Sequence, residues 1–393
     1  MNIKTLKDKI FSISLNRKKA VFSVFLSFLF AILLMVSSGW NLPINTQKDL
    51  LYLFNLLSEG SAKKEANDAF LRDSLLLIDV QYDKVMALKM ASKNVADGYV
   101  AITDRLLLKE FLDSLNSRKD YKYIILDIFF EKSVRQSEDT ALFNLISSMD
   151  NIVIPYPENG ELADPCLKNK AGEVKYRVPF WETDFVKYPY FLDGAKSIAT
   201  RMYEDITKSK INTFGPFYIE KGIVRSSAIL TFDLLDDSFY HSYLSDVLGK
   251  NPIHKNTTSM FSEYKDYTKD KYILIGDFAN DRHITYTGEM SGTMINFNAF
   301  LAMKNGHHRY SIIAFLVLWI VFFYYSYQIL TRASTSSWFV FRYPFVLTVI
   351  CFFCYMFNEI YDVFVGSIIL YLLRVCVDAY YYFKHIITLK RNK

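Results

Sequence analysis

Long apolar runs stand near both ends of the chain, and no comparable run occurs between them. The first, at 20–40, is long enough to cross a hydrocarbon core about 30 Å thick. The others follow one another late in the sequence, at 310–330, 338–357 and 360–383. This pattern predicts an N-terminal membrane anchor, a large polar domain at 41–309, and about three further transmembrane helices after it.

Lysine and arginine gather in the two tails, 1–19 and 384–393, and again at Arg332. Because positive residues in short flanks stay on the cytoplasmic side, we expect both tails in the cytoplasm and 41–309 outside it. A cleavable signal peptide has an apolar stretch of only about 7–15 residues and a small-residue cleavage site. The first span is longer and has no A-x-A sequence, so we expect an uncleaved anchor.

Within 41–309, short continuous apolar runs indicate strands that are buried on both faces. These runs lie at 75–80, 123–130, 151–155 and 272–276. Helical spacing occurs at 103–115, 138–148 and 294–303, an amphipathic linker helix is expected within 41–72, and 215–225 has the pattern of a β-hairpin. Strands that alternate with helices predict an α/β domain with a mainly parallel sheet and an inserted hairpin.

Acidic residues follow the predicted strands. Asp79, Asp127 and Asp277 lie in or directly after three of them. Ligands of open parallel sheets bind outside the carboxyl ends of the strands. Together with Glu131 and Asp281, these carboxylates indicate an acidic crevice that would bind a cation or an amine as its small ligand.

The same acidic residues also have a structural interpretation, because they would equally cap helix N-termini or pair with Arg105 and Arg282. Asp281, His283 and Thr285 alternate, so an extended segment would place all three on one face. Structural metal sites use about four ligands, and the domain has no second histidine cluster away from the membrane edge. We therefore expect no metal site, and His283 joins the candidate ligand-binding residues.

Several classes of function are disfavoured by what the sequence lacks. It contains no G-x-S-x-G elbow, no P-loop and no G-x-G-x-x-G motif, so we expect neither an enzyme nor a cofactor. The net charge of +5 comes mostly from basic residues beside the apolar runs, which argues against nucleic-acid binding. Of 4 cysteines only Cys166 lies in 41–309, so no disulfide is expected there, and Cys351-x-x-Cys354 in a span has packing as its expected role.

Two charged residues lie in the last predicted span. Arg374 and Asp378 are one turn apart on the same helix face, so they can pair. Ionisable groups in a membrane span usually face protein, which makes them candidate transmembrane coupling residues that contact neighbouring spans or a partner subunit. The alternative is that both lie near the cytoplasmic interface and extend towards water.

The order of these motifs, with one predicted span before them and three after them, resembles that of the type-two CHASE domain. This is an extracellular sensory module found with cyclases and histidine kinases. The resemblance covers 20–383. The residues that carry it are Leu77-Ile78-Asp79, Thr103-Asp104-Arg105, Ile125-Leu126-Asp127-Ile128-Phe129-Phe130, Ile273-Leu274-Ile275-Gly276, Asp281-Arg282-His283-Ile284-Thr285, Gly292 and Asn298. The chain departs from the family at Gly98-Tyr99-Val100-Ala101-Ile102, where members commonly have a Pro/Trp-rich stretch.

The resemblance implies a sensory domain on the outer side of a bacterial inner membrane. Family members usually continue into an output domain, whereas this chain ends shortly after its last predicted span. We therefore expect the signal to pass through the transmembrane helices to a separate effector protein, and a homo-oligomer is compatible with that arrangement. The alternative function is a non-enzymatic membrane scaffold or assembly subunit of an envelope complex.

Overall fold

The computed structural model of the chain divides into two compact units, Ser58–His308 and a second formed by Met1–Leu57 together with Arg309–Lys393. They are called the sheet unit and the membrane unit below. The structure describes residues 3–39, 47–58, 69–70, 73–92, 95–157, 161–174, 184–215, 217–229, 241–250, 267–286, 288–331, 338–357 and 359–391.

A six-stranded sheet with the order β14-β1-β15-β4-β5-β6 forms the centre of the sheet unit, and every neighbouring pair in it is parallel. Its strands are β1 (Leu75–Asp79), β4 (Tyr123–Leu126), β5 (Ile152–Pro155), β6 (Ala171–Gly172), β14 (Ser242–Tyr243) and β15 (Tyr272–Gly276). Every residue of β1, β4, β5 and β15 is buried, as their continuous apolar runs require. The last of these strands in the chain, β15, lies between β1 and β4.

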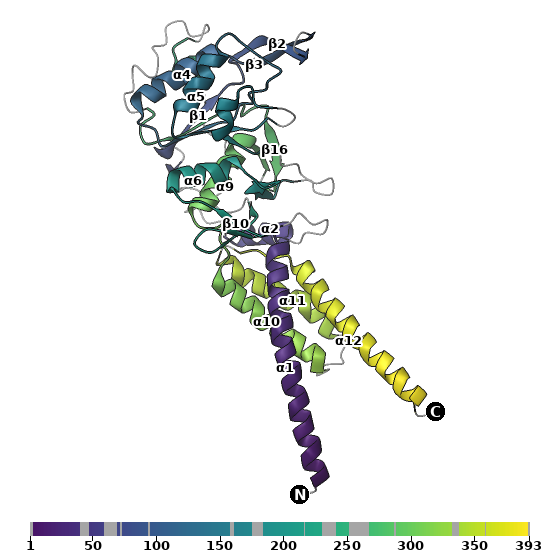
Figure 1. Ribbon diagram of the computed structural model, residues 1–393. Helices are drawn as coiled ribbons and strands as arrows, with labels where there is room; N and C mark the ends of the chain where they lie inside the picture. Colours follow the sequence, from purple (N-terminus) through teal and green to yellow (C-terminus); the bar gives the residue numbers. More distant parts are fainter. Residues whose placement is uncertain are drawn as a thin grey trace. The chain divides into compact units, whose positions relative to one another are not determined.

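Helices cover both faces of this sheet (Figure 1). One face packs against α4 (Arg105–Arg118), α5 (Asp139–Ser148), the 3-10 helix η1 (Pro165–Asn169) and α7 (Leu244–Val247). The other packs against α6 (Ile198–Thr207) and α9 (Gly292–Lys304). The start of α4 is fixed by Asp104, whose carboxylate accepts the backbone N–H groups of Leu106 and Leu107.

Short antiparallel pairs surround the sheet. They are β2 (Lys84–Ser92) with β3 (Val95–Thr103), β7 (Lys187–Pro189) with β13 (Ser227–Ile229), β8 (Phe191–Leu192) with β9 (Ala195–Lys196), β16 (Arg282–Thr285) with β17 (Gly288–Ser291), and β10 (Asn212–Phe214) with β11 (Phe217–Ile219) and β12 (Ile223–Val224). The β2–β3 ribbon projects from the sheet unit in Figure 1. The β16–β17 hairpin joins β15 to α9 and therefore borders the carboxyl edge of the sheet.

The membrane unit is helical. It comprises α1 (Ile3–Ser37), α2 (Gln47–Ser58), α10 (Ile312–Thr331), α11 (Trp338–Tyr355) and α12 (Val363–Arg391). Segments of α1, α10 and α12 (Arg17–Ser37, Ile312–Thr331 and Val363–Thr388) are long and apolar enough to cross a membrane, and α11 contains the shorter apolar segment Tyr343–Tyr355. The chain therefore has the helices of a multi-pass membrane protein.

Small residues of α1 are buried in the membrane unit, and α1 packs closely against α10. Ser23, Ser27 and Ala31 recur every fourth residue of α1, and all three are fully buried. The Trp319 indole on α10 donates a hydrogen bond to the carbonyl oxygen of Val24 over 3.3 Å. Small residues at this spacing are typical of close helix–helix contacts in membranes, where packing rather than water drives association.

The parallel sheet, the inserted hairpin and the helices at all four apolar runs are confirmed, with shifted ends. The predicted strand at 123–130 stops at Leu126, and the helix expected from residue 294 begins at Gly292. The linker helix expected within 41–72 is present as α2, while much of that range and Arg332 lie outside the described residues. The β2–β3 and β16–β17 pairs were not predicted.

We expect Ser27→Leu to destabilise the membrane unit, because the larger side chain overfills the contact between α1 and α10, at a cost of about 1–3 kcal/mol. Cys351 and Cys354 are buried in α11 of the same unit, so their labelling by a thiol-reactive dye on heating reports its unfolding. The labelling midpoint of the full chain in detergent should fall. Val21→Leu is the matched control, because Val21 is exposed on the same helix; equal shifts for both variants would contradict this packing.

Candidate ligand-binding site

Three carboxylates meet at the carboxyl edge of the sheet, on three adjacent strands. Asp79 ends β1, Asp277 follows β15 and Asp127 follows β4. Asp79 is in register with Gly276 of β15. The pairing of Ile275 with Leu126 places Asp127 beside Gly276 as well. Asp79 and Asp127 thus continue the rows of side chains that face α6 and α9.

Two residues of the first turns of α9 hold Asp127. Its Oδ2 atom accepts a hydrogen bond from Thr293 Oγ1 over 2.9 Å and another from Asn296 Nδ2 over 3.2 Å. The side-chain oxygen Oδ1 of Asn296 in turn accepts a hydrogen bond from the buried Tyr188 hydroxyl over 2.5 Å. Both bonds to Asp127 end on Oδ2, so its Oδ1 accepts neither of them.

Two glycines make this network fit. A methyl group on Gly276 would collide with Thr293 Oγ1, and one on Gly292 would collide with Asp281 Oδ2. Without the first glycine, Thr293 could not reach Asp127. Without the second, the Asp281 carboxylate could not lie against the start of α9. The close approach of α9 to the strand ends therefore depends on both positions lacking a side chain.

The surroundings of Asp127 disfavour its charged form. The pKa of Asp127 is raised to about 6, mainly by burial and also by the nearby negative charge of Asp281, while the hydrogen bonds from Thr293 and Asn296 and the charge of His283 oppose the rise. A carboxyl group with this pKa is only partly ionised near pH 6. A cation placed beside it would favour the ionised form.

An acid–base pair borders Asp127. His283 Nε2 lies 3.3 Å from Asp281 Oδ1, and both side chains are about half exposed. The hydrogen bond with Asp281 raises the pKa of His283, burial opposes the rise, and the charges of Asp281 and Asp127 add to it. The ring of Phe185 lies 6.3 Å from that of His283. As the sequence pattern indicated, β16 is extended, and it brings His283 and Asp281 together with Asp127.

Asp79 lies at the end of β1, on the side of β15 away from β4, and Asp277 directly follows β15. Burial raises the pKa of Asp79, and the charge of Asp277 contributes to the rise. Asp277 itself pairs with Lys84 of β2 over 2.6 Å and accepts the backbone N–H of Asn280. Burial raises the pKa of Asp277, but Lys84 and Asn280 outweigh it, so the pKa is lowered overall. Its charge is therefore already balanced by a lysine.

Glu131 stands apart from the other candidates. Its side chain is exposed and accepts the Ser133 hydroxyl over 3.1 Å. The alternative pairing with the two arginines is not what the structure shows, since Arg105 lies 3.5 Å from Asp139 and Arg282 lies 3.4 Å from Glu289. Two of the carboxylates instead cap the turns that follow their strands: Asp277 accepts the backbone N–H of Asn280, and Asp79 accepts that of Gln81.

Sequence reasoning missed the residues that complete the network: Thr293, Asn296, Tyr188, Lys84 and the space left by Gly276 and Gly292. A signal for two of them was present. Thr293 and Asn296 are polar, three residues apart, and lie in the first turns of a helix that is otherwise almost wholly apolar. The other contacts join segments far apart in the chain, which no local pattern indicates.

The predicted coupling pair also forms. Arg374 Nε lies 3.7 Å from Asp378 Oδ2 on α12, and the Arg374 side chain is 22% exposed whereas that of Asp378 is 59% exposed.

Among the described residues, no group of three or more His, Cys, Asp or Glu side chains is arranged to hold a metal ion. The carboxyl edge of the sheet has the carboxylates of Asp127 and Asp281 as hydrogen-bond acceptors, with His283 beside them.

Comparison of the chain with protein-family models, with curated proteins and with solved structures returned no match. The resemblance to type-two CHASE domains consequently stays a hypothesis that rests on the motifs quoted above.

We expect Asp127→Asn to stabilise the sheet unit at pH 8 by ~1–3 kcal/mol, because it removes a charge that burial disfavours. Since the folded pKa lies above the unfolded one, the wild type gains stability below about pH 4 and loses it as pH rises through about 6. At pH 8 the backbone amides of β4 and β15 in the full-length variant should exchange hydrogen more slowly than in the wild type.

Below pH 4 the wild type and Asp127→Asn should exchange their backbone amide hydrogens at the same rate. The exposed Asp150 supplies the control substitution, Asp150→Asn, which should leave exchange unchanged at both pH values. A difference between Asp127→Asn and the wild type of the same size at pH 4 and pH 8 would show that the charge of Asp127 is not what destabilises the sheet.

Proposed function

We propose that this protein is a membrane-anchored sensor whose sheet unit binds a small cationic ligand at the carboxyl edge between β4 and β15, and whose transmembrane helices relay that event to a separate effector chain. In this proposal the four helices at the apolar runs all cross a bacterial inner membrane, both tails are cytoplasmic, and the sheet unit lies outside.

The observation that carries the proposal is that the helix after β15 packs on the opposite face of the sheet from the helices after its neighbours. The helices that follow β1, β4 and β14 pack on one face of the sheet, whereas α9, which follows β15, packs on the other. Such a reversal opens a crevice outside the carboxyl ends of the two strands concerned, and open α/β sheets bind their ligands there. Asp127, Asp281 and His283 lie together at the carboxyl ends of these strands.

The charge of these groups favours a cation. Two carboxylates lie together, and Oδ1 of Asp127 accepts none of the hydrogen bonds that hold the side chain. An amine or guanidinium group would donate to that oxygen and offset the repulsion between Asp127 and Asp281. Charge-assisted hydrogen bonds of this kind contribute about 1.5–3 kcal/mol.

A path from the site towards the membrane unit exists in the chain itself. Thr293 and Asn296, which hold Asp127, belong to the start of α9. Every residue of α9 from Thr293 to Met303 is buried, so the helix is packed along its length and is expected to move as a unit. The membrane-spanning helix α10 begins at Ile312, soon after α9 ends at Lys304.

Titration of the full chain in lipid nanodiscs with small primary amines, polyamines and guanidino compounds tests the proposal by calorimetry, and the N-acetylated form of each amine is the uncharged control. We expect saturable binding of at least one cation, about tenfold or more weaker in Asp127→Asn and in Asp281→Asn, as the loss of a charge-assisted hydrogen bond predicts. Affinity should rise with pH through about 6, because Asp127 ionises in that range.

Glu131→Gln is the matched control, since Glu131 is an exposed carboxylate outside the network. It should leave affinity unchanged. Absence of binding across the panel, or an equal loss in the Glu131 variant, would remove the carboxyl edge as a cation site.

A scaffold function is the second candidate, and the β2–β3 ribbon favours it. Met86 and Tyr99 of this ribbon are 64% and 71% exposed, and Leu88, paired with Tyr99, lies on the same face. Exposed apolar patches of this kind mark protein–protein contacts. Stoichiometric co-purification of an envelope protein that is lost in Met86→Ser with Tyr99→Ser, without any ligand dependence, would favour the scaffold.

A further inference from the structure

The last helix of the membrane unit presents charged residues on an exposed face. Arg374 and Asp378 pair within α12, yet the Asp378 side chain remains 59% exposed. Tyr381 fixes the level of this pair, because its hydroxyl accepts a hydrogen bond from Lys19 Nζ over 3.4 Å. Lys19 closes the basic stretch Arg17-Lys18-Lys19 that precedes the apolar run of α1, so Tyr381 lies at the same end of the membrane unit as that stretch.

Asp378 and Arg374 lie on the membrane side of that level. At 1.5 Å of rise per residue, they precede Tyr381 by about 4.5 Å and about 10 Å respectively. Charged side chains in the hydrocarbon region are costly and in most membrane proteins face other protein. An exposed carboxylate at this depth therefore points to a protein surface that covers it.

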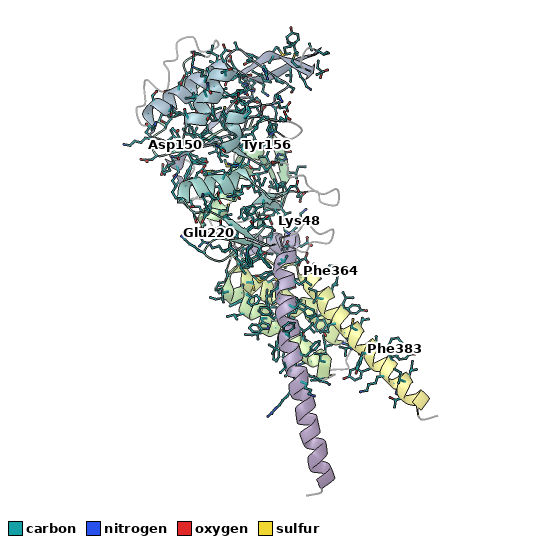
Figure 2. All side chains as sticks on the ribbon, in the orientation of Figure 1. Lys48, Asp150, Tyr156, Glu220, Phe364 and Phe383 are labelled. Carbon is teal, nitrogen blue, oxygen red and sulfur yellow. The ribbon has the colours of Figure 1, made fainter. Side chains whose placement is uncertain are left out.

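The residues around Asp378 form a continuous seam. Tyr371, Val375, Asp378 and Tyr382 are all exposed, and they follow one another at intervals of four, three and four residues. This is the spacing at which a helix contacts a second helix along its length. Leu370, by contrast, is fully buried within the membrane unit. Figure 2 marks Phe364 near the start of α12 and Phe383 towards its C-terminal end, on either side of this stretch.

Arg374 lies beside the seam, and it and Asp378 have opposite charges that can also pair between two copies of the chain. Two copies of one membrane protein have the same orientation, so a contact between their α12 helices is parallel and symmetric. In that arrangement Arg374 of each copy approaches Asp378 of the other, and the four charges sum to zero. A partner of different sequence would need its own matching pair at the same depth.

We propose that the seam of α12 formed by Tyr371, Val375, Asp378 and Tyr382 is the contact between two copies of this chain, with Arg374 and Asp378 interacting across a two-fold axis. The contact does not depend on a ligand at the carboxyl edge. It joins the last transmembrane helices of two sensors into a symmetric pair, the form in which a change in either copy reaches its neighbour.

Oxidative cross-linking in native membranes tests the seam. The four native cysteines of the full chain are replaced by alanine, and single cysteines are then introduced with Val375→Cys or Tyr382→Cys. The controls keep only the native Cys376 or carry Tyr380→Cys, since both positions are exposed but lie on the far side of the same helix. We expect disulfide-linked dimers at 375 and 382, and about tenfold less at 376 and 380, the change that ~1.4 kcal/mol produces.

The charges are tested in the Val375→Cys chain. Arg374→Asp or Asp378→Arg alone should reduce cross-linking about tenfold, because like charges then meet across the axis. Co-expression of these two variants should restore it, since one copy carries two acids and the other two bases. Neither variant has an ion pair within its own helix, so recovery reports the contact between copies and also shows that both variants are folded.

Three results would overturn the proposal: equal cross-linking at 375, 376 and 380, no recovery on co-expression, or cross-links at 375 only to a different protein. The first would mean random collision, the second a role for the ion pair within one helix, and the third a partner of another sequence.

Discussion

The sheet unit depends on the insertion of β15 between β1 and β4. Without it, both neighbours would have unpaired backbone groups in the middle of the core, which is costly in the absence of water. The pairing is highly non-local, since Leu75 meets Tyr272, and contacts of this kind form only after the intervening chain has been ordered. The centre of the sheet is therefore complete only when the segment that leads into α9 has arrived.

This order of assembly places the segment after β15 at the candidate site. Because the chain leaves β15 on the face opposite to α4 and α5, the β16–β17 hairpin and the start of α9 border the carboxyl edge. Two glycines, Gly276 and Gly292, let them approach the strand ends closely enough for Thr293 to bind Asp127. A ligand at this edge would act on the helix that continues towards α10.

The sequence predicted the parts of this structure that depend on local pattern. Continuous apolar runs predicted β1 and β15, and helical spacing at 103–115 predicted α4. The carboxylates near strand ends predicted that Asp127 and Asp281 are neighbours. Long-range contacts were beyond it. The order of strands, the partners of Asp127 on α9 and the pairing of Asp277 with Lys84 arise from tertiary packing. The β2–β3 ribbon was missed because its exposed apolar residues do not alternate with polar ones as in a half-buried strand.

The charge of Asp127 does not contribute to the stability of the sheet unit. An asparagine there would accept the same two hydrogen bonds, from Thr293 and Asn296, without a charge to desolvate. The aspartate instead has a pKa raised to about 6 by burial and by Asp281, so folding alone gains nothing from its ionisation. Locally unfavourable groups that persist in a packed region are typical of functional sites. A bound cation would offset that unfavourable charge, and the binding free energy would then act on α9, the one helix that contacts this carboxylate directly in the part of the chain that the structure describes.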